Sequence, residues 1–318
     1  MADICFNYFL LTKSIMFVPS FKKNYLFLTL VLITGSGGAL GRLFALEFTK
    51  CGAEVVLWDV DANNKEETAR LVREAGGKAY PYRVDVTNRV EVYRTADEVW
   101  TDLGRNVTML VNNAGVVAGE QLMDCPDELV GRTMKVNCHT LFWMTKAFVP
   151  QMKEQNHGHI ITIASILGLF STACVESLAH KLLTEEWLDG VKTTVVCPYI
   201  VDTGMFDGSL FLAPLEPEYC VEQAMNAILI DQPLVCIPRL TYLPVISRAL
   251  LPWASNVVTY RFMGSDKCMY PFIKSKKNKL TNGGPTLIAA NSLSLSLQCL
   301  QTKSKGQFHR HILSLVLD

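Results

Sequence analysis

The sequence predicts a doubly wound α/β fold, in which helices cover both faces of a parallel sheet, followed by an apolar C-terminal cap. From residue 30 onward, short apolar and β-branched runs alternate with amphipathic stretches. The runs are almost continuously apolar, which is typical of strands buried on both faces of a parallel sheet. A glycine-rich stretch, TGSGGALGR (34–42), directly follows the first run, at the place where a strand would turn into a helix.

Each predicted element rests on this alternation between apolar runs and amphipathic stretches. The expected strands lie within 30–35, 54–59, 79–85, 107–115, 159–165, 192–198 and 233–238. The expected helices span 39–51, 64–75, 89–103, 126–153 and 217–231. Because a helical stretch separates most consecutive strands, the connections are long enough for parallel pairing.

The chain divides into four predicted segments. These are an apolar leader (1–29), the α/β domain (30–238), the apolar cap (239–275) and a tail expected to be disordered (276–318). The leader is apolar over 4–19 but is interrupted by Lys13, and it is short of the roughly 18–20 apolar residues that a spanning helix needs. A membrane anchor, a signal peptide and a disordered leader all stay open for it. The cap either packs on the core or faces a membrane.

The composition excludes several function classes. The 30 basic and 30 acidic residues leave no net charge, whereas a nucleic-acid-binding protein would carry a basic stripe. The 10 cysteines include no C-x-x-C pair, so neither a zinc site nor a disulfide framework is predicted, and a reducing compartment fits. His157 and His159 flank a glycine, but this loop offers no third or fourth metal ligand.

The glycine-rich stretch and Asp59 together predict a dinucleotide site. Glycines allow a tight turn and let a pyrophosphate approach the backbone N–H groups at the start of a helix. Asp59 ends the second expected strand, where a carboxylate can accept both ribose hydroxyls of an adenosine and repels a 2′-phosphate. The combination favours NAD over NADP, and the alternative is a glycine-rich turn in an unrelated α/β fold.

Three motifs along the domain carry a family resemblance. Thr34-Gly35 to Gly41, Asp85-Val86 and Asn112-Asn113-Ala114-Gly115 together resemble the short-chain dehydrogenases/reductases. Further stretches, among them CPDELVGRTMKVNCHTLFW, GHIITIAS and CPYIVDTGMF, are similar to the membrane-associated retinol dehydrogenases within that family. The resemblance covers about residues 30 to 275 and implies a Rossmann-type sheet.

This resemblance implies a set of residues that hold the cofactor. Gly35 and Gly41 would frame the pyrophosphate, and Ala39 stands where the family has its middle glycine. The full expected set is Gly35, Ser36, Leu40 and Gly41 in the turn, Asp59 at the adenosine ribose, Asp85 and Val86 at the adenine, Asn113, Ala114 and Gly115 near the nicotinamide-side ribose, and Thr203 at the carboxamide.

The catalytic group that the resemblance implies is incomplete in this chain. Ser165 matches the family serine that polarises the substrate oxygen, and Asn137 matches the asparagine of the proton relay. The family's tyrosine and lysine positions fall at Leu178 and Leu182, and no tyrosine occurs between Ser165 and Tyr199. In the family the lysine makes the phenolate accessible, because a free tyrosine has a pKa near ~10. An internal deletion is the simplest account.

Two other positions do not replace the missing pair. Lys181 has no tyrosine to activate, and a surface helix lysine is the simpler interpretation. Tyr270 and Lys274 have Y-x-x-x-K spacing, but Pro271 follows the tyrosine directly and resists a helix interior. The same deletion predicts exposed apolar surface and a weakened homodimer.

The resemblance therefore implies NAD-dependent oxidation of a lipophilic alcohol. The first expectation is oxidation of all-trans-retinol to retinal, and a steroid or a fatty alcohol is the alternative substrate. It also implies the cytoplasmic face of the endoplasmic reticulum membrane, with the lipid droplet as an alternative. A basic cluster at 274–279 either contacts anionic lipid or is a solvated tail. Because the tyrosine and lysine are absent, the chain itself is expected to be inactive. The alternative hypothesis is a cofactor-binding pseudo-enzyme that acts through partners.

Overall fold

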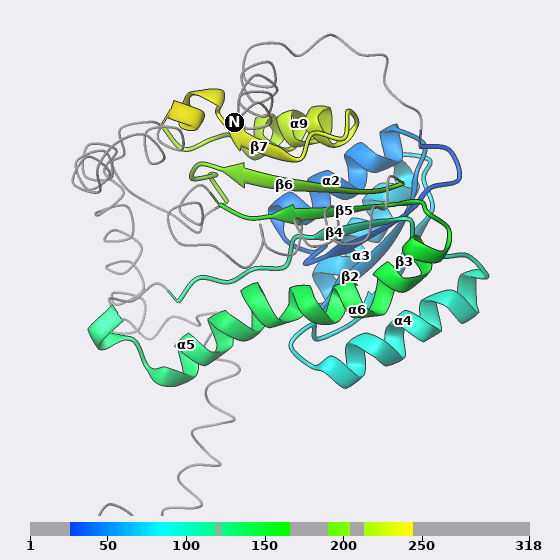
Figure 1. The fold of residues 1–318 in the computed structure, drawn as a ribbon, viewed down its shortest axis with the longest axis horizontal. Helices are drawn as coiled ribbons and strands as arrows, with labels where there is room; N and C mark the ends of the chain where they lie inside the picture. The colour runs from blue at the N-terminus through cyan, green and yellow to red at the C-terminus, as the bar shows by residue number, and fades with distance from the viewer. Residues whose placement is uncertain (1–25, 119–121, 166–189, 204–212, 244–318) are drawn as a thin grey trace, which may run out of the picture. The chain divides into compact units, whose positions relative to one another are not determined.

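A computed structural model of the protein describes residues 26–118, 122–165, 190–203 and 213–243. Within these residues, one sheet contains seven strands in the order β3-β2-β1-β4-β5-β6-β7 (Figure 1). The strands are β1 (Leu30–Thr34), β2 (Glu54–Asp59), β3 (Ala79–Arg83), β4 (Met109–Asn112), β5 (Gly158–Ile163), β6 (Val191–Pro198) and β7 (Leu234–Ile237). Every neighbouring pair of these strands is parallel, which confirms the predicted doubly wound sheet.

Helices cover both faces of this sheet. The helices are α2 (Ala39–Lys50), α3 (Ala62–Glu74), α4 (Arg89–Leu103), α5 (Asp127–Met134), α6 (Thr140–Glu154) and α9 (Pro217–Ile228). Short 3-10 turns lie at Leu122–Asp124 and Arg239–Thr241. Buried residues of α2, α3 and α9 belong to one apolar cluster, and those of α4 and α6 belong to the other.

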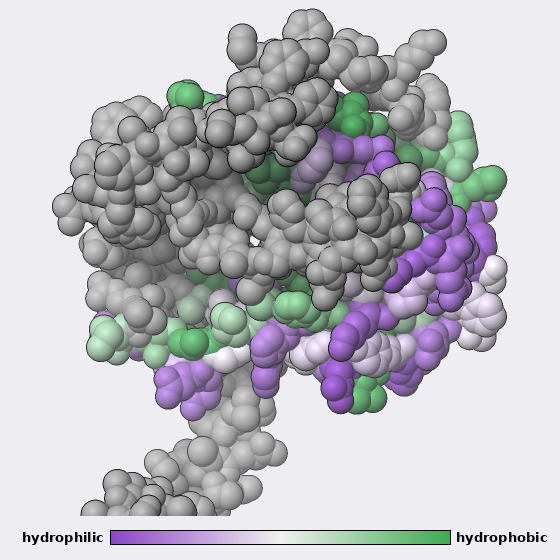
Figure 2. All heavy atoms as spheres, viewed as in Figure 1, coloured by the Kyte–Doolittle hydropathy of each residue, from purple (hydrophilic) through white to green (hydrophobic). Residues whose placement is uncertain are grey.

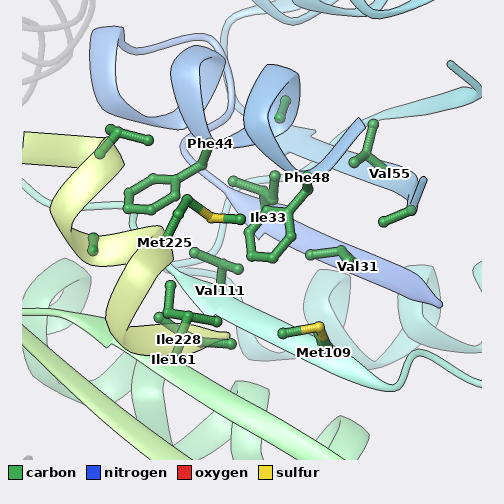
Figure 3. Packing of buried hydrophobic residues seen from close by; sticks show 14 of the residues in the cluster. Val31, Ile33, Phe44, Phe48, Val55, Met109, Val111, Ile161, Met225 and Ile228 are labelled. Carbon is green, nitrogen blue, oxygen red and sulfur yellow. The ribbon is translucent and has the colours of Figure 1, made fainter. Parts of the chain in front are cut away.

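The first cluster lies between the sheet and the helices α2 and α9. Phe44 and Phe48 of α2 lie over Ile33 and Val111 of the central strands, and Met225 of α9 closes the cluster from the side (Figure 3). Phe44, Phe48, Ile33 and Val111 are each 1% exposed or less. A fully buried side chain of this size stabilises a fold by about 1.5–3 kcal/mol, so this cluster fixes the central strands whose ends carry the glycine-rich turn.

The second cluster lies on the opposite face. Trp58 of β2 meets Phe148 of α6 edge to face, with ring centroids 5.6 Å apart and planes at 62°, an arrangement that aromatic rings prefer. Val92 and Val99 of α4 are buried in the same cluster. The outer surface over α4 is mostly hydrophilic (Figure 2), so α4 is an amphipathic helix with its apolar side toward the sheet.

Local capping explains where two helices begin. α3 starts at Ala62, two residues earlier than predicted, because the Asp61 carboxylate accepts the N–H groups of Asn63 and Asn64 at 2.9 and 3.1 Å. Such a side-chain cap fixes a helix start. α4 has the predicted bounds, because Asn88 caps its start and Gly104, at φ +60°, ends it in the left-handed conformation, which glycine favours.

The expected helix 126–153 is broken by a wider turn. α5 and α6 are joined by a π-helical turn at Lys135–His139.

Several predictions lie outside the described residues: the leader up to residue 25, the cap beyond residue 243, the tail, and the Leu178 and Leu182 positions.

Candidate functional site

The predicted cofactor residues lie at or after the carboxyl ends of the strands β1, β2, β3, β4 and β6. β1 pairs with β2 on one side and with β4 on the other, so the chain order of the strands reverses between β1 and β4. Ligands of open parallel sheets bind outside the carboxyl ends of the strands at such a reversal. The glycine-rich turn (residues 35–38) leaves β1 at this place and leads into α2.

One glycine of this turn and one in the first helical turn of α2 cannot be replaced without moving backbone. Gly35 has φ +64°, and a Cβ there would lie 2.9 Å from the Ala114 Cα. A Cβ on Gly41 would lie 2.2 Å from the Gly35 carbonyl oxygen. The turn, the start of α2 and the segment after β4 therefore pack backbone against backbone, which is the geometry the glycines were predicted to provide.

The start of α2 can bind an anion. Its N-cap residue is Gly38, which has no side chain to accept a helical N–H, and the first four N–H groups of an α-helix have no partner within the helix. These N–H groups are partial positive charges at the positive end of the helix dipole. Leu40 supplies only backbone here, because its side chain packs against the first apolar cluster.

Asp59 is held in a defined orientation beside this turn. Its Oδ2 accepts the N–H of Gly37 and its Oδ1 accepts the N–H of Asp61, each at 2.8 Å. An ionised carboxylate has about four acceptor positions, so each oxygen can accept a further hydrogen bond. The carboxylate is half-buried and is oriented before any ligand binds.

Asn113 and Thr34 tie the glycine-rich turn to the segment after β4. The Asn113 Nδ2 donates to the carbonyl oxygens of Thr34 and Gly35 at 2.9 and 3.1 Å. The Thr34 Oγ1 accepts the N–H groups of Asn113 and Ala114 at 3.0 and 3.1 Å. The side chain of Asn113 thus braces the turn, and Gly115 lies beyond it on exposed backbone.

Asp85 and Val86 follow β3, where the family resemblance predicts the adenine side of the site. One oxygen of Asp85 accepts the N–H and the hydroxyl of Thr87 at 2.9 and 2.7 Å, so the carboxylate stabilises its own turn. Val86 is 9% exposed, and its carbonyl oxygen accepts the hydroxyl of Thr140 at 3.0 Å. Thr140 is the first residue after the π-helical turn, so it connects the adenine side to the turn that carries Asn137.

Asn137 lies in the middle of that π-helical turn. Its Oδ1 accepts the N–H of Val116 at 2.9 Å, and its Nδ2 donates to the Val116 carbonyl oxygen at 2.8 Å. One side chain thereby satisfies both polar groups of Val116, and the segment after β4 is fixed to the helix. A wide turn inside an α-helix is frequently found at functional sites.

The remaining predicted residues lie at the same edge of the sheet. Ser165 follows β5 and is half-buried, and Thr203 follows β6, where its N–H donates to the Val201 carbonyl oxygen at 2.9 Å. Ser36 differs from the others: it is 0% exposed, and its Oγ is buried without a hydrogen-bond partner in the structure. It therefore presents no surface to a ligand.

The chain matches the family model for short chain dehydrogenase over residues 29–210. It belongs to the short-chain dehydrogenase family. Among curated relatives, it is 48% identical to retinol dehydrogenase 10 of Xenopus tropicalis over 297 residues, which cover 79% of this chain and 86% of the relative. Retinol dehydrogenase 10 of Homo sapiens is 49% identical over 297 residues, with the same shares covered. The chain is thus an oxidoreductase-family member, as the sequence motifs predicted.

Solved members of the family share the fold at low identity. A short-chain dehydrogenase/reductase from Burkholderia phymatum, solved in complex with NAD, aligns with a TM-score of 0.62 at 24% identity, covering 71% of this chain and 94% of that chain. A bulky-bulky ketone specific alcohol dehydrogenase from Comamonas testosteroni aligns with a TM-score of 0.61 at 19% identity, covering 71% and 96%. These similarities show the family fold.

The alignment to the relatives contains positions that this short-chain dehydrogenase lacks. It runs over 297 residues, more than the 79% of this 318-residue chain that it uses. Some residues of the relative therefore have no counterpart here. The segment between Ser165 and Tyr199, where the family tyrosine would fall, contains no tyrosine.

The described residues of this family member offer no metal site, and two of their buried cysteines are unreactive. No group of three or more metal-ligating side chains occurs there. His159 is a buried residue of β5, and burial lowers its pKa to about 4, although Asp231 acts in the opposite direction. Burial also raises the pKa of the Cys220 and Cys236 thiols to about 12, which makes both poor nucleophiles. Over the described residues, none of the helices has the length and apolar character needed to cross a membrane.

Sequence reasoning missed the roles of Thr34 and Thr140. Both are buried threonines, 1% and 3% exposed, whose hydroxyls connect segments far apart in the chain. Thr34 belongs to the quoted Thr34-Gly35 pair, so its place directly before the turn was the available signal. Nothing in the pattern around Thr140 distinguishes it from an ordinary helix residue.

Proposed function

We propose that this chain binds NAD, rather than NADP, at the carboxyl ends of β1 and β4. The observation that carries the proposal is the orientation of Asp59, whose two oxygens are each held by one backbone N–H at 2.8 Å while further acceptor positions stay open. Both hydroxyls of an adenosine ribose can donate to such a carboxylate, and a 2′-phosphate would be repelled. The N–H groups at the start of α2 would hold the pyrophosphate.

The backbone around the turn fits a cofactor of this shape. The close approach of Gly35 and Gly41 to neighbouring backbone leaves the turn without side chains that would keep a pyrophosphate away from the N–H groups. The Burkholderia phymatum protein, which has the same fold, was solved in complex with NAD, and this supports a nicotinamide dinucleotide as the ligand. Bound nicotinamide accepts or delivers the hydride, and the protein supplies orientation and proton transfer.

The substrate class proposed for this lineage is a lipophilic alcohol, with all-trans-retinol oxidised to retinal. The support is the name of the relatives, retinol dehydrogenase 10, at 48–49% identity. A steroid or a fatty alcohol is the alternative. We also propose a place at the cytoplasmic face of the endoplasmic reticulum membrane or at a lipid droplet, and a homodimer, because the sequence motifs resemble the membrane-associated retinol dehydrogenases.

For this exact chain we infer cofactor binding without ordinary turnover. Oxidation of an alcohol moves a hydride from the carbinol carbon and a proton from its hydroxyl, and the family assigns that proton to a tyrosine activated by a lysine. Those positions are Leu178 and Leu182 here. Loss of one positioned acid–base group typically slows a reaction about 10²–10⁴-fold. The chain is then either an incomplete form of an enzyme or a pseudo-enzyme that acts through partners.

Two measurements on the purified chain test these proposals. NAD titration followed by protein fluorescence should show saturable binding, and Asp59→Ala should weaken it while Asp124→Ala, on the 3-10 turn before α5, should not. Chromatographic detection of retinal should show no turnover of all-trans-retinol with NAD. Absence of NAD binding would refute the cofactor proposal, and retinal formation at a rate unaffected by Ser165→Ala would refute a role for the family serine.

Sequencing the transcript across the codons for Cys174 to Leu183 separates the two versions of the inactive chain. An additional in-frame segment with Tyr-x-x-x-Lys in the main transcript would make this chain an incomplete form of an enzyme. Confirmation of the Glu176-Ser177 junction as the main form would favour the pseudo-enzyme.

A further inference from the structure

Arg42 of α2 and Thr68 of α3 are connected to the glycine-rich turn by hydrogen bonds. The Thr68 Oγ1 donates to the Ser36 carbonyl oxygen at 3.0 Å and accepts the Arg42 Nε–H at 3.3 Å. The Arg42 Nη2 also donates to the Gly37 carbonyl oxygen at 3.4 Å. Two carbonyl groups of the turn are thus held by the side chains of two residues that are not in the expected set of cofactor residues.

The hydroxyl proton of Thr68 has two possible acceptors, the carbonyl oxygens of Ser36 and Asn64, and the bond to Ser36 is the more favourable one. The Asn64 carbonyl oxygen lies 3.1 Å from Thr68 Oγ1, but in an α-helix it also accepts the backbone N–H four residues later. Ser36 and Thr68 are both 0% exposed, so water cannot replace the hydroxyl at the Ser36 carbonyl. A buried carbonyl without a donor is destabilising, which favours the bond to the turn.

These bonds extend to Asp59 through a single peptide group. The carbonyl of Ser36 is held by Thr68, and the N–H of the same peptide, which belongs to Gly37, donates to the Asp59 Oδ2 at 2.8 Å. Because a peptide group is planar, fixing the direction of its carbonyl fixes the direction of its N–H. A continuous chain therefore runs from the Arg42 guanidinium through Thr68 and this peptide to the Asp59 carboxylate.

The charges at the two ends strengthen the chain. A cation donates at one end and an anion accepts at the other, and consecutive hydrogen bonds of this kind polarise one another. The interior member, Thr68, is fully buried, where the local dielectric is low. One of the two hydrogen bonds that orient Asp59 thus depends on a residue of α3.

We propose that Thr68 and Arg42 are positioning residues that act through Asp59 and set the affinity for the adenosine ribose of the cofactor. The inference rests on the proposed dinucleotide function and adds to it a mechanism by which residues without ligand contact determine affinity. Loss of the Thr68 hydroxyl frees the Ser36–Gly37 peptide to rotate and releases one of the two N–H groups that orient the carboxylate.

Thr68→Val tests this with the full-length chain and NAD as the probe. It keeps the shape of the side chain and removes the hydroxyl, and should raise the Kd for NAD about fivefold, as expected for one lost hydrogen bond. Thr68→Ser should restore the affinity to within about twofold of the parent. Thr145→Val is the matched control, because Thr145 donates to the Leu141 carbonyl oxygen within α6 at 2.6 Å and touches neither the turn nor Asp59. It should leave the Kd unchanged.

A double-mutant cycle decides whether Thr68 acts through Asp59. In an Asp59→Ala background, Thr68→Val should change the Kd for NAD less than about twofold, because the group it orients is gone. An equal fivefold effect in both backgrounds would overturn the inference and leave NAD binding itself intact. Hydrogen exchange of the Gly37 amide without cofactor gives a separate readout, and should accelerate in Thr68→Val. Unchanged exchange would overturn the inference, whereas a parent chain that does not bind NAD would overturn the proposed function.

Discussion

Acidification should destabilise this protein through His159. The imidazole Nε2 lies 2.8 Å from the Thr194 Oγ1, and that hydroxyl donates to the Gln232 carbonyl oxygen at 2.9 Å. The hydroxyl proton is used in that bond, so the neutral imidazole carries its proton on Nε2 and donates it to Thr194. The side chain is 8% exposed, with Nδ1 3.6 Å from an Asp231 carboxylate oxygen. Protonation of Nδ1 would place a cation among buried strands.

The expected magnitude follows from the difference between the folded and unfolded pKa values. Burial lowers the pKa of His159 to about 4 from an ordinary value of 6.5, with Asp231 raising it and Lys192 lowering it further. The unfolded chain therefore binds a proton between pH 6.5 and 4 that the folded protein does not bind. Stability is present above pH 6.5 and is lost as the pH falls toward 4. The loss should reach about 3 kcal/mol of unfolding free energy, at about 1.36 kcal/mol per pH unit.

Urea unfolding at several pH values between 7.5 and 4.5, followed by circular dichroism, measures this loss. His159→Gln keeps an N–H donor for Thr194 but does not titrate, so its stability should fall about 2–3 kcal/mol less than that of the parent over this range. His157→Gln, at an exposed position two residues away, should follow the parent. Parallel stability curves for the parent and His159→Gln would refute the reasoning.

Two further changes test the site. Gly41→Ala should abolish NAD binding and lower the unfolding free energy by about 1–3 kcal/mol, because its Cβ would lie 2.2 Å from the Gly35 carbonyl oxygen. The control is Gly131→Ala, whose Cβ would have nothing within 4 Å and which should stabilise the protein by up to about 1 kcal/mol. Calorimetry compares the unfolding of the two variants. Asn137→Ala should change stability by less than about 1 kcal/mol, since its bonds to Val116 are exposed, yet accelerate exchange of the Val116 amide. Unaltered exchange there would contradict the assigned brace.

The sheet was predictable because its strands are buried on both faces. Apolar runs such as Val31–Ile33 and Val55–Leu57 contain no polar residues, so their pattern differs from that of an amphipathic surface helix. All six residues are 0% exposed. The π-helical turn at Lys135–His139 was not predictable in the same way. It adds about one residue to a turn of helix, which barely changes the apolar periodicity on which a helix prediction depends.

The site was predictable in its position and less so in the direction of its side chains. Asp59 ends its strand beside the glycine-rich turn as its spacing indicated, because parallel strands bring their carboxyl ends to one edge. Ser36 was expected to contact the cofactor but is completely buried. The spacing also did not reveal that the Asn113 side chain donates to the carbonyls of the turn. Sequence spacing places a residue in a turn, whereas the backbone angles of that turn decide where its side chain points.

The contacts that prepare the cofactor half of the site do not depend on the segment where the tyrosine and lysine are missing. Thr34 and Asn113 brace the turn, Gly37 orients Asp59, and Asn137 fixes the segment after β4. All of these residues precede residue 138, while the absent pair would fall at Leu178 and Leu182. We therefore expect dinucleotide affinity and turnover to be separable in this chain, since losing the proton acceptor removes none of the bonds that orient Asp59. That separation is what makes NAD binding without retinal formation a physically consistent outcome rather than a sign of a misfolded protein.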